Sequence, residues 1–167
     1  YLAQYTNAPA LIDADTGLLM RDEHGNLLVI NRVQGALAPF NQSGVKPDLN
    51  GTLEKDQKIH HTVFHAMVER YLDSDYAPEA VAARVGVSAG RIRAIAAEIA
   101  RVAFEESFDI DQEWTDFRGE VHSKMTARPV SMHAMRGISA HSNGFQTCRA
   151  LHILQILLGT VEVPGGF

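Results

Sequence analysis

Residues 128–167 read RPVSMHAMRGISAHSNGFQTCRALHILQILLGTVEVPGGF. The first part is short and apolar and predicts a strand, and the middle part is a polar loop bounded by Gly137 and Gly144. The last part predicts an apolar helix that ends at Gly159. In open α/β sheets, ligands bind in the crevice beyond the carboxyl end of a strand. The order strand, loop, helix therefore makes this loop the first candidate for a binding site.

The loop carries hydroxyl, imidazole and amide side chains just before the predicted helix, on Ser139, His141, Ser142 and Asn143. Free backbone N–H groups and the dipole at a helix N-terminus favour a phosphate or another polar ligand here. The same side chains can instead cap the helix and bond the loop backbone. The pattern supports both interpretations equally. No nucleophile elbow is present, and these residues are too close in sequence to form a catalytic triad by themselves.

The N-terminal half predicts one hairpin, one long loop and one helix. The runs Gly17–Arg21 and Asn26–Asn31 alternate in polarity around a turn-forming segment, which is typical of a β-hairpin. Residues 32–58 show no sustained periodicity and predict a surface loop. Helical spacing returns from Thr62 to Leu72. His61 and His65 have the spacing of a metal pair, but with no third ligand apparent they are interpreted as surface and boundary histidines.

Residues 76–103 predict a helix-turn-helix. Pro78 marks the start of the first helix, Gly86 its end, and Ser88 the cap of the second helix. Three arginines lie on the second helix: Arg91, Arg93 and Arg101. The motif is compatible with reading DNA in the major groove, and equally with two helices that pack inside a larger fold. The acidic balance of the chain and the lack of a dimerisation element favour packing.

Residues 104–126 are acidic and irregular and predict a connecting loop with Trp114 and Phe117 as its anchors. The carboxylates do not follow the spacing of a calcium loop and are interpreted as solvated. They are Asp109, Asp111, Glu113, Asp116 and Glu120.

Composition narrows the classes of function. The 167 residues are 46% hydrophobic and 21% charged, with a net charge of −5, which is ordinary for a globular domain and argues against a broad nucleic-acid footprint. Cys148 is the single cysteine, so this sequence holds neither a disulfide nor a cluster built from several thiolates. No apolar run reaches the roughly 20 residues that a membrane helix needs.

Three stretches carry a resemblance to a known family. They are YTNAPALI at 5–12, YAPEAVAARVGVSAGRIRAIAAEIA at 76–100, and RGISAHSNG at 136–144 followed by LGTVEVPGG at 158–166. Together and in this order they resemble the large catalytic subunit of the molybdopterin oxidoreductases, the dimethyl sulfoxide reductase superfamily. Within it they are similar to the branch of sulfite dehydrogenases and thiosulfate or polysulfide reductases. Members are several times longer, so the chain is expected to be an internal segment, as its start at Tyr1 and its final turn also suggest.

The resemblance implies a molybdenum or tungsten ion held by two molybdopterin guanine dinucleotides, with iron–sulfur clusters elsewhere in the full-length protein. The cluster cysteines and the metal-ligating residue would lie upstream, so the segment alone is expected to be inactive. Contacts to the cofactor would fall on Gly137, Ser139, His141 and Asn143. Many members have Gln where this chain has Ala140, so that contact is lost here or passes to His141 or Asn143.

The predicted fold is α/β, a partial segment of a multidomain oxidoreductase with a β-hairpin and helices followed by a strand-loop-helix unit. Residues 1–126 are expected to end one α/β domain, and residues 127–167 to re-enter the neighbouring cofactor-binding domain. The implied substrate is a small inorganic sulfur compound or related oxyanion. The implied partners are the rest of the catalytic subunit, an iron–sulfur electron-transfer subunit, and also a membrane-anchor subunit, with no nucleic acid. A small DNA-binding helix-turn-helix protein is the alternative, and the cellular compartment is left open.

Overall fold

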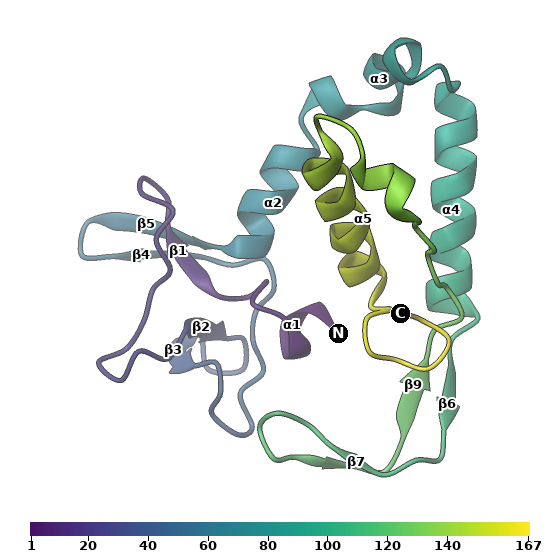
Figure 1. The fold of residues 1–167 in the computed structure, drawn as a ribbon. Coiled ribbons are helices and arrows are strands. Elements are labelled where there is room, and N and C mark those ends of the chain that lie inside the picture. Colours follow the sequence, from purple (N-terminus) through teal and green to yellow (C-terminus); the bar gives the residue numbers. More distant parts are fainter. The chain divides into compact units, whose positions relative to one another are not determined.

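A computed structural model describes all residues 1–167 and divides the chain into two compact units, Tyr1–Val81 and Ala82–Phe167. Figure 1 shows their helices and strands. The predicted α/β class is confirmed: short helices alternate with small sheets, and every strand pair in them is antiparallel. The predicted boundary at residue 126, between two domains of a longer protein, stays a prediction. No helix combines the length and the apolar character needed to cross a membrane.

The first unit is built on a three-stranded sheet in the order β1-β5-β4, with β1 at Leu11–Asp13, β4 at Thr52–Lys55 and β5 at Lys58–Thr62. The helix α1 (Leu2–Tyr5) precedes it. β4 and β5 form a hairpin whose two turn residues, Asp56 and Gln57, have φ of 53° and 61°. Two consecutive positive φ values match the twist of the flanking strands. β5 pairs with β1 on one edge and with β4 on the other, so it is the central strand of this sheet.

A second hairpin extends into the segment that the sequence predicted to be loop. β2 (Leu28–Asn31) pairs with β3 (Ala36–Pro39), and a small core forms from Val29, Ala38 and Val45 with Phe40 against it. The prediction of a loop over 32–58 is therefore wrong, because β3, β4 and the start of β5 fall inside it. Strands of four or five residues set among Gly, Pro and Asn are too short for the alternation to be seen in the sequence.

The predicted hairpin over 17–31 is confirmed in outline. Arg21 and Leu27 pair as an antiparallel bridge, and the Leu28 N–H donates to the Met20 carbonyl at 3.0 Å. Asp22 closes the turn, since its Oδ1 accepts the backbone N–H groups of His24 and Asn26. A side-chain oxygen that bonds the backbone two residues on is the reason Asp favours such turns.

Asp13 joins the end of β1 to β5. Its side chain is 12% exposed; Oδ2 accepts a hydrogen bond from Lys58 Nζ at 2.8 Å, while Oδ1 accepts the N–H groups of Asp15 and Thr16. The Lys58 ammonium, helped by the Thr16 and Asp15 N–H groups and opposed by burial, holds the pKa of this carboxyl well below its usual value of 3.8. The folded state therefore binds the ionised form more strongly than the unfolded state does.

Because the folded state binds the ionised form of Asp13 more strongly, we expect the first unit to lose stability in acid. The contribution of Asp13 to stability is complete above its unfolded pKa and is lost as the pH falls below about 4 toward the folded pKa. Thermal unfolding of Asp13→Asn, followed by circular dichroism from about pH 3 to 7, should therefore depend less on pH than that of the wild type. Glu54→Gln, which removes an exposed carboxylate on β4, is the control. Equal acid sensitivity in Asp13→Asn and wild type would contradict the assignment.

The helix predicted from Thr62 is confirmed as α2, Val63–Tyr71. Thr62 is fully buried and caps it, since its hydroxyl oxygen accepts the His65 N–H at 3.1 Å. A short 3-10 turn, η1 (Ser74–Tyr76), follows, and then α3 (Pro78–Val85), which contains the boundary between the two units.

The helix-turn-helix is also confirmed. α3 ends before Gly86, and α4 (Ala89–Glu105) begins after Ser88, whose hydroxyl oxygen accepts the Arg91 N–H at 3.3 Å. Beyond α4 the prediction of an irregular connector is wrong, because four short strands form two small antiparallel pairs. β6 (Phe108–Ile110) pairs with β9 (Met125–Ala127), and β7 (Trp114–Thr115) pairs with β8 (Val121–His122). Phe117 is 60% exposed and is no anchor.

The strand predicted at the start of 128–167 does not form. β9 ends at Ala127, and residues 128–135 are irregular before the 3-10 turn η2 (Arg136–Ser139) and the helix α5 (Gly144–Leu158). Pro129 has no N–H to donate to a sheet, and the Arg128 N–H instead donates to the Pro164 carbonyl at 3.0 Å. α5 ends as predicted at Gly159, whose φ of 67° suits a glycine.

Candidate functional site

The predicted binding loop is held between η2 and α5. The Ala140 N–H donates to the Gly137 carbonyl, and the Gly144 N–H donates to the His141 carbonyl at 2.9 Å. These bonds make two consecutive tight turns, so the loop has a defined backbone. All four residues predicted to contact a cofactor, Gly137, Ser139, His141 and Asn143, are exposed. The structure thus places them together at one end of α5, and their role in binding stays a prediction.

The two glycines that bound the loop differ in what they allow. A Cβ at Gly144 would lie 2.1 Å from the Ser139 carbonyl oxygen, so this position must be glycine for α5 to begin where it does. A Cβ at Gly137 would meet no atom within 4 Å, and its φ is not in the left-handed region. Gly144 therefore shapes the loop, whereas packing within this chain gives no reason for glycine at position 137.

The side chains of the loop do not cap the helix. Asn143 occupies the N-cap position, but it makes no side-chain hydrogen bond there, and the Ser139 hydroxyl donates to the Arg136 carbonyl at 2.9 Å. The backbone N–H groups of Phe145 and Gln146, in the first turn of α5, donate to no backbone acceptor. The structure therefore does not support the interpretation in which Asn143 caps the helix. The backbone N–H groups in the first turn of α5 can therefore donate hydrogen bonds to an anion or another polar ligand.

Two contacts within the second unit involve the residues that flank the loop, one before it at Arg128 and one after it on α5. The Arg128 guanidinium donates to the Ala103 carbonyl at 3.1 Å and lies 5.3 Å above the ring of Phe104, both in the last turns of α4. Gln155 is 1% exposed on α5 and bonds to His152 at 3.0 Å. Cys148, also on α5, is half-buried, and the sequence expectation that it is not a metal ligand of the implied cofactor stays a prediction.

The acidic turn between β7 and β8 is better ordered than the sequence indicated. The Asp116 side chain is 3% exposed; Oδ1 accepts the N–H groups of Arg118 and Glu120, and Oδ2 lies 3.1 Å from His122 Nε2. Burial raises the pKa of Asp116, but the Glu120 N–H and the His122 ring outweigh it and leave the pKa lowered. The interpretation of Asp116 as solvated is therefore wrong. Its carboxylate closes a turn, and the Trp114 ring stacks on His122 with centroids 4.6 Å apart.

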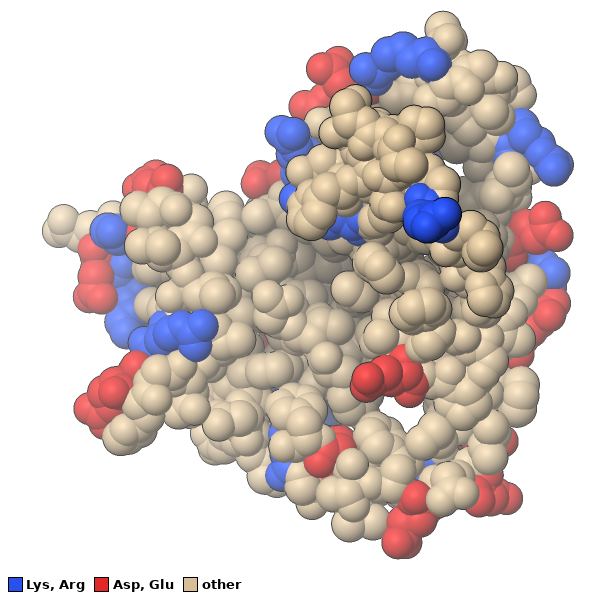
Figure 2. Space-filling model, in the orientation of Figure 1, with Lys and Arg blue, Asp and Glu red and all other residues tan.

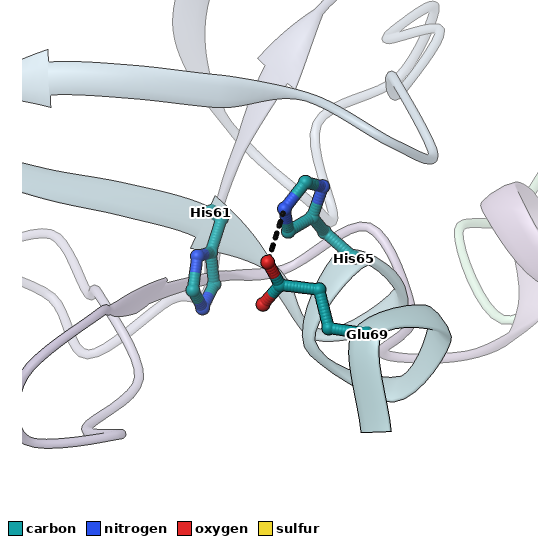
Figure 3. A group of neighbouring side chains, drawn as sticks. All are labelled: His61, His65 and Glu69. Atoms are coloured by element: carbon teal, nitrogen blue, oxygen red, sulfur yellow. Dashed lines mark ion pairs between the residues drawn. The ribbon is translucent and has the colours of Figure 1, made fainter. Parts of the chain in front are cut away.

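The structure also gives the His61 and His65 pair the third ligand that the sequence interpretation lacked. Glu69 lies one turn further along α2, and its Oε1 is 3.5 Å from His65 Nε2. His61 is not on the helix but near the end of β5. Figure 3 shows the three side chains pointing toward one another. This cluster could have been found from the spacing of His61, His65 and Glu69, which recur every four residues.

The helix-turn-helix offers less basic surface than its sequence suggested. Arg101 is ion-paired with Glu106 at the end of α4, and the Glu106 carboxylate raises the pKa of Arg101. On the face drawn in Figure 2, basic and acidic side chains lie in small separate groups with uncharged surface between them. The Arg101 guanidinium is already paired within the chain, so it is less available to a phosphate backbone.

Comparison with known proteins gives one informative similarity. No family model matches the chain. The chain is 35% identical over 185 aligned residues to a sulfite dehydrogenase subunit of Allochromatium vinosum. The alignment covers 100% of this chain but 19% of the relative, so the chain spans about a fifth of the length of the curated relative that it matches. The similarity therefore runs through both units, including the loop before α5, and links the chain to one segment of an oxidoreductase.

Proposed function

We propose that the chain is a segment of a molybdenum or tungsten oxidoreductase that acts on a small inorganic sulfur compound or a related oxyanion. The observation that carries the proposal is the 35% identity along the whole chain to a sulfite dehydrogenase subunit. Catalysis itself would depend on residues outside these 167. The role of this segment is to form part of the wall that holds a bis-molybdopterin guanine dinucleotide cofactor.

The loop before α5 supports this role by its chemistry. A pterin dinucleotide carries phosphates and hydrogen-bonding rings, and the loop offers the exposed side chains of His141 and Asn143 beside the free N–H groups of Phe145 and Gln146. A helix N-terminus with unpaired donors favours a negatively charged group. The cofactor supplies two-electron redox chemistry when bound. These residues would bind and orient one end of it, and Gly144 would keep the backbone close enough to do so.

The partners of such a segment follow from the relative, which is named as one subunit of its enzyme. We propose that its immediate partner is the rest of the catalytic subunit. An iron–sulfur electron-transfer subunit, together with a membrane-anchor subunit, would complete the assembly. Iron–sulfur clusters would be bound by other parts of the protein, because this chain has one cysteine.

The proposal predicts a cofactor defect in loop variants of the intact protein. Asn143→Ala and His141→Ala should each reduce molybdenum or tungsten content, because losing one hydrogen bond to a charged group costs about 1.5–3 kcal/mol, or roughly 10- to 150-fold in affinity. Metal content is measured by mass spectrometry, and sulfite-dependent reduction of an artificial electron acceptor is measured alongside. His133→Ala, an exposed histidine before the loop, is the control. Intact protein without either metal would overturn the proposal. Unchanged content in both variants would remove the loop from the cofactor site.

A second candidate function rests on the two consecutive helices α3 and α4, which are joined by a short turn. As a DNA-binding element it would show binding to duplex DNA that weakens steeply with salt. The oxidoreductase proposal expects no such binding. A fluorescence titration of the intact protein with duplex DNA at low and moderate salt distinguishes the two.

A further inference from the structure

We propose that His61, His65 and Glu69 form a binding site for a divalent transition-metal ion, with Zn²⁺ as the reference ion. The site lies entirely within the first unit, where β5 meets α2 (Figure 3). It is separate from the loop before α5, and it does not rest on the proposed oxidoreductase function.

The three ligand atoms are already grouped. One nitrogen of each histidine and one oxygen of Glu69 lie within 4.8 Å of one another. Ligand atoms around a tetrahedral zinc ion are about 3.3 Å apart, because Zn–N and Zn–O bonds are about 2.0–2.1 Å long. His65 Nε2 and Glu69 Oε1 are at 3.5 Å, close to this separation. The remaining ligand atom, on His61, lies within 4.8 Å of both.

A hydrogen bond orients the ring of His65. Its Nδ1 lies 3.0 Å from Asn50 Oδ1. This contact holds the ring so that Nε2 is on the side of Glu69, 3.5 Å from Oε1. Histidines that bind metals are commonly oriented in this way by a second group on the other ring nitrogen. Asn50 therefore acts as the positioning residue for this ligand.

The supporting elements are constrained. His61 is opposite Ile12 on one neighbouring strand and Thr52 on the other, so β5 is bonded on both sides at this position. The Thr62 cap fixes the first turn of α2, which carries His65. The two imidazole rings stack with centroids 5.1 Å apart and an interplanar angle of 27°. Sites built on regular elements hold their ligands more accurately than sites built on loops.

A helical pair of His65 and Glu69 would explain the carboxylate near His65 without a metal ion. Such a pair does not explain why His61, on β5, lies close to the same two ligand atoms. Nor does it explain why Asn50 contacts the other ring nitrogen of His65. Two imidazoles and one carboxylate form a ligand set typical of zinc, and three protein ligands leave a fourth position for water or a small ligand.

The chain provides a matched control. His24 and Glu23 form another histidine–carboxylate pair, also at 3.5 Å, but both side chains are largely exposed, at 75% and 86%. No third ligand is grouped with them. His24→Ala therefore removes an equivalent pair while leaving the proposed site intact.

The test uses the intact protein, stripped with EDTA and titrated with Zn²⁺ by calorimetry, with zinc content per chain measured by mass spectrometry. The wild type should bind one more Zn²⁺ per chain than His61→Ala/His65→Ala, and His24→Ala should match the wild type. Asn50→Ala should weaken the site by about 10- to 100-fold, as expected for a group that orients a ligand, and Glu69→Gln should weaken it at least as much.

Equal zinc binding by the wild type and the double variant would overturn the proposal, as would an equal loss in His24→Ala. If the double variant does not fold, the exposed positions Asn50 and Glu69 decide: unchanged affinity in both single variants also overturns it. None of these results depends on molybdenum content or sulfite oxidation, so failure of this inference and failure of the proposed function can be told apart.

Discussion

Replacing Thr62 with alanine will lower the local free energy of unfolding of α2 by about 2–3 kcal/mol. The Thr62 hydroxyl is fully buried, donates to the Leu49 carbonyl at 2.8 Å and accepts the His65 N–H at 3.1 Å. Loss of an N-cap costs about 1 kcal/mol, and a partly buried carbonyl left without its donor adds about 1–2 kcal/mol. The two costs arise together because one oxygen makes both bonds.

Native-state hydrogen exchange on the amides of α2 in the intact protein measures this effect, since it reports local opening. Thr62→Ser keeps the oxygen and loses a methyl group, so its exchange should stay much closer to that of the wild type. If serine and alanine destabilise α2 equally, packing of the methyl group rather than the hydroxyl holds the helix start. Thr62→Ala should also weaken zinc binding, because His65 lies in the first turn that the hydroxyl fixes.

Replacing Gly144 with alanine will disrupt the start of α5. The added Cβ would lie 2.1 Å from the Ser139 carbonyl oxygen and 2.6 Å from its carbon, and both are backbone atoms that cannot rotate away. Relieving such an overlap by a backbone shift costs about 1–3 kcal/mol. Amide exchange in the first turns of α5 should therefore accelerate in the intact protein.

Gly137→Ala is the matched control for this change, because a Cβ there has open space around it. It should leave exchange in α5 unchanged. Comparable acceleration in both variants would show that the loop tolerates no side chain at either glycine and that the overlap at Gly144 is not the cause. Reduced molybdenum or tungsten content in Gly144→Ala, together with faster exchange in α5, would tie the position of α5 to cofactor binding.

The helices were predictable from local signals. Pro78, Gly86 and Ser88 mark the ends of α3 and α4, and Gly159 marks the end of α5, as the structure confirms. Start and stop residues act through bonds to the first or last turn, so they are visible in a single sequence. The spacing of apolar residues in α2 is local in the same sense.

Apart from the hairpin over 17–31, most strands were not predictable because their partners are distant. β1 pairs with β5 from far along the chain, Leu11 opposite Thr62, and β6 pairs with β9 around the inserted β7 and β8. Strands of two to five residues carry too few positions to show alternation by themselves. The strand expected after Arg128 did not form for a different reason: Pro129 has no N–H to donate, and the Arg128 N–H donates to the Pro164 carbonyl instead.

For the candidate sites too, the sequence showed which residues cluster locally but not which distant residues they meet. The loop before α5 was found because polar residues and glycines cluster in sequence, but the difference between Gly137 and Gly144 depends on where the Ser139 carbonyl lies. The proposed metal cluster was half found. His61 and His65 were noted, whereas Glu69 was not recognised as a third ligand, and Asn50 comes from the segment predicted as loop.

The hydrogen bond from Arg128 to Pro164 joins the two ends of the segment that carries the loop and α5. Gly165 also lies close to Arg128 and Pro129, where a Cβ would be 3.2 Å from their backbone atoms. The chain therefore enters and leaves this segment at one point. A segment with adjoining ends can be exchanged for that of a related protein without stretching the remaining backbone. Residues 128–165 are thus a natural unit for grafting, and chimaeras made at these two positions would transfer the loop and its supporting helix together.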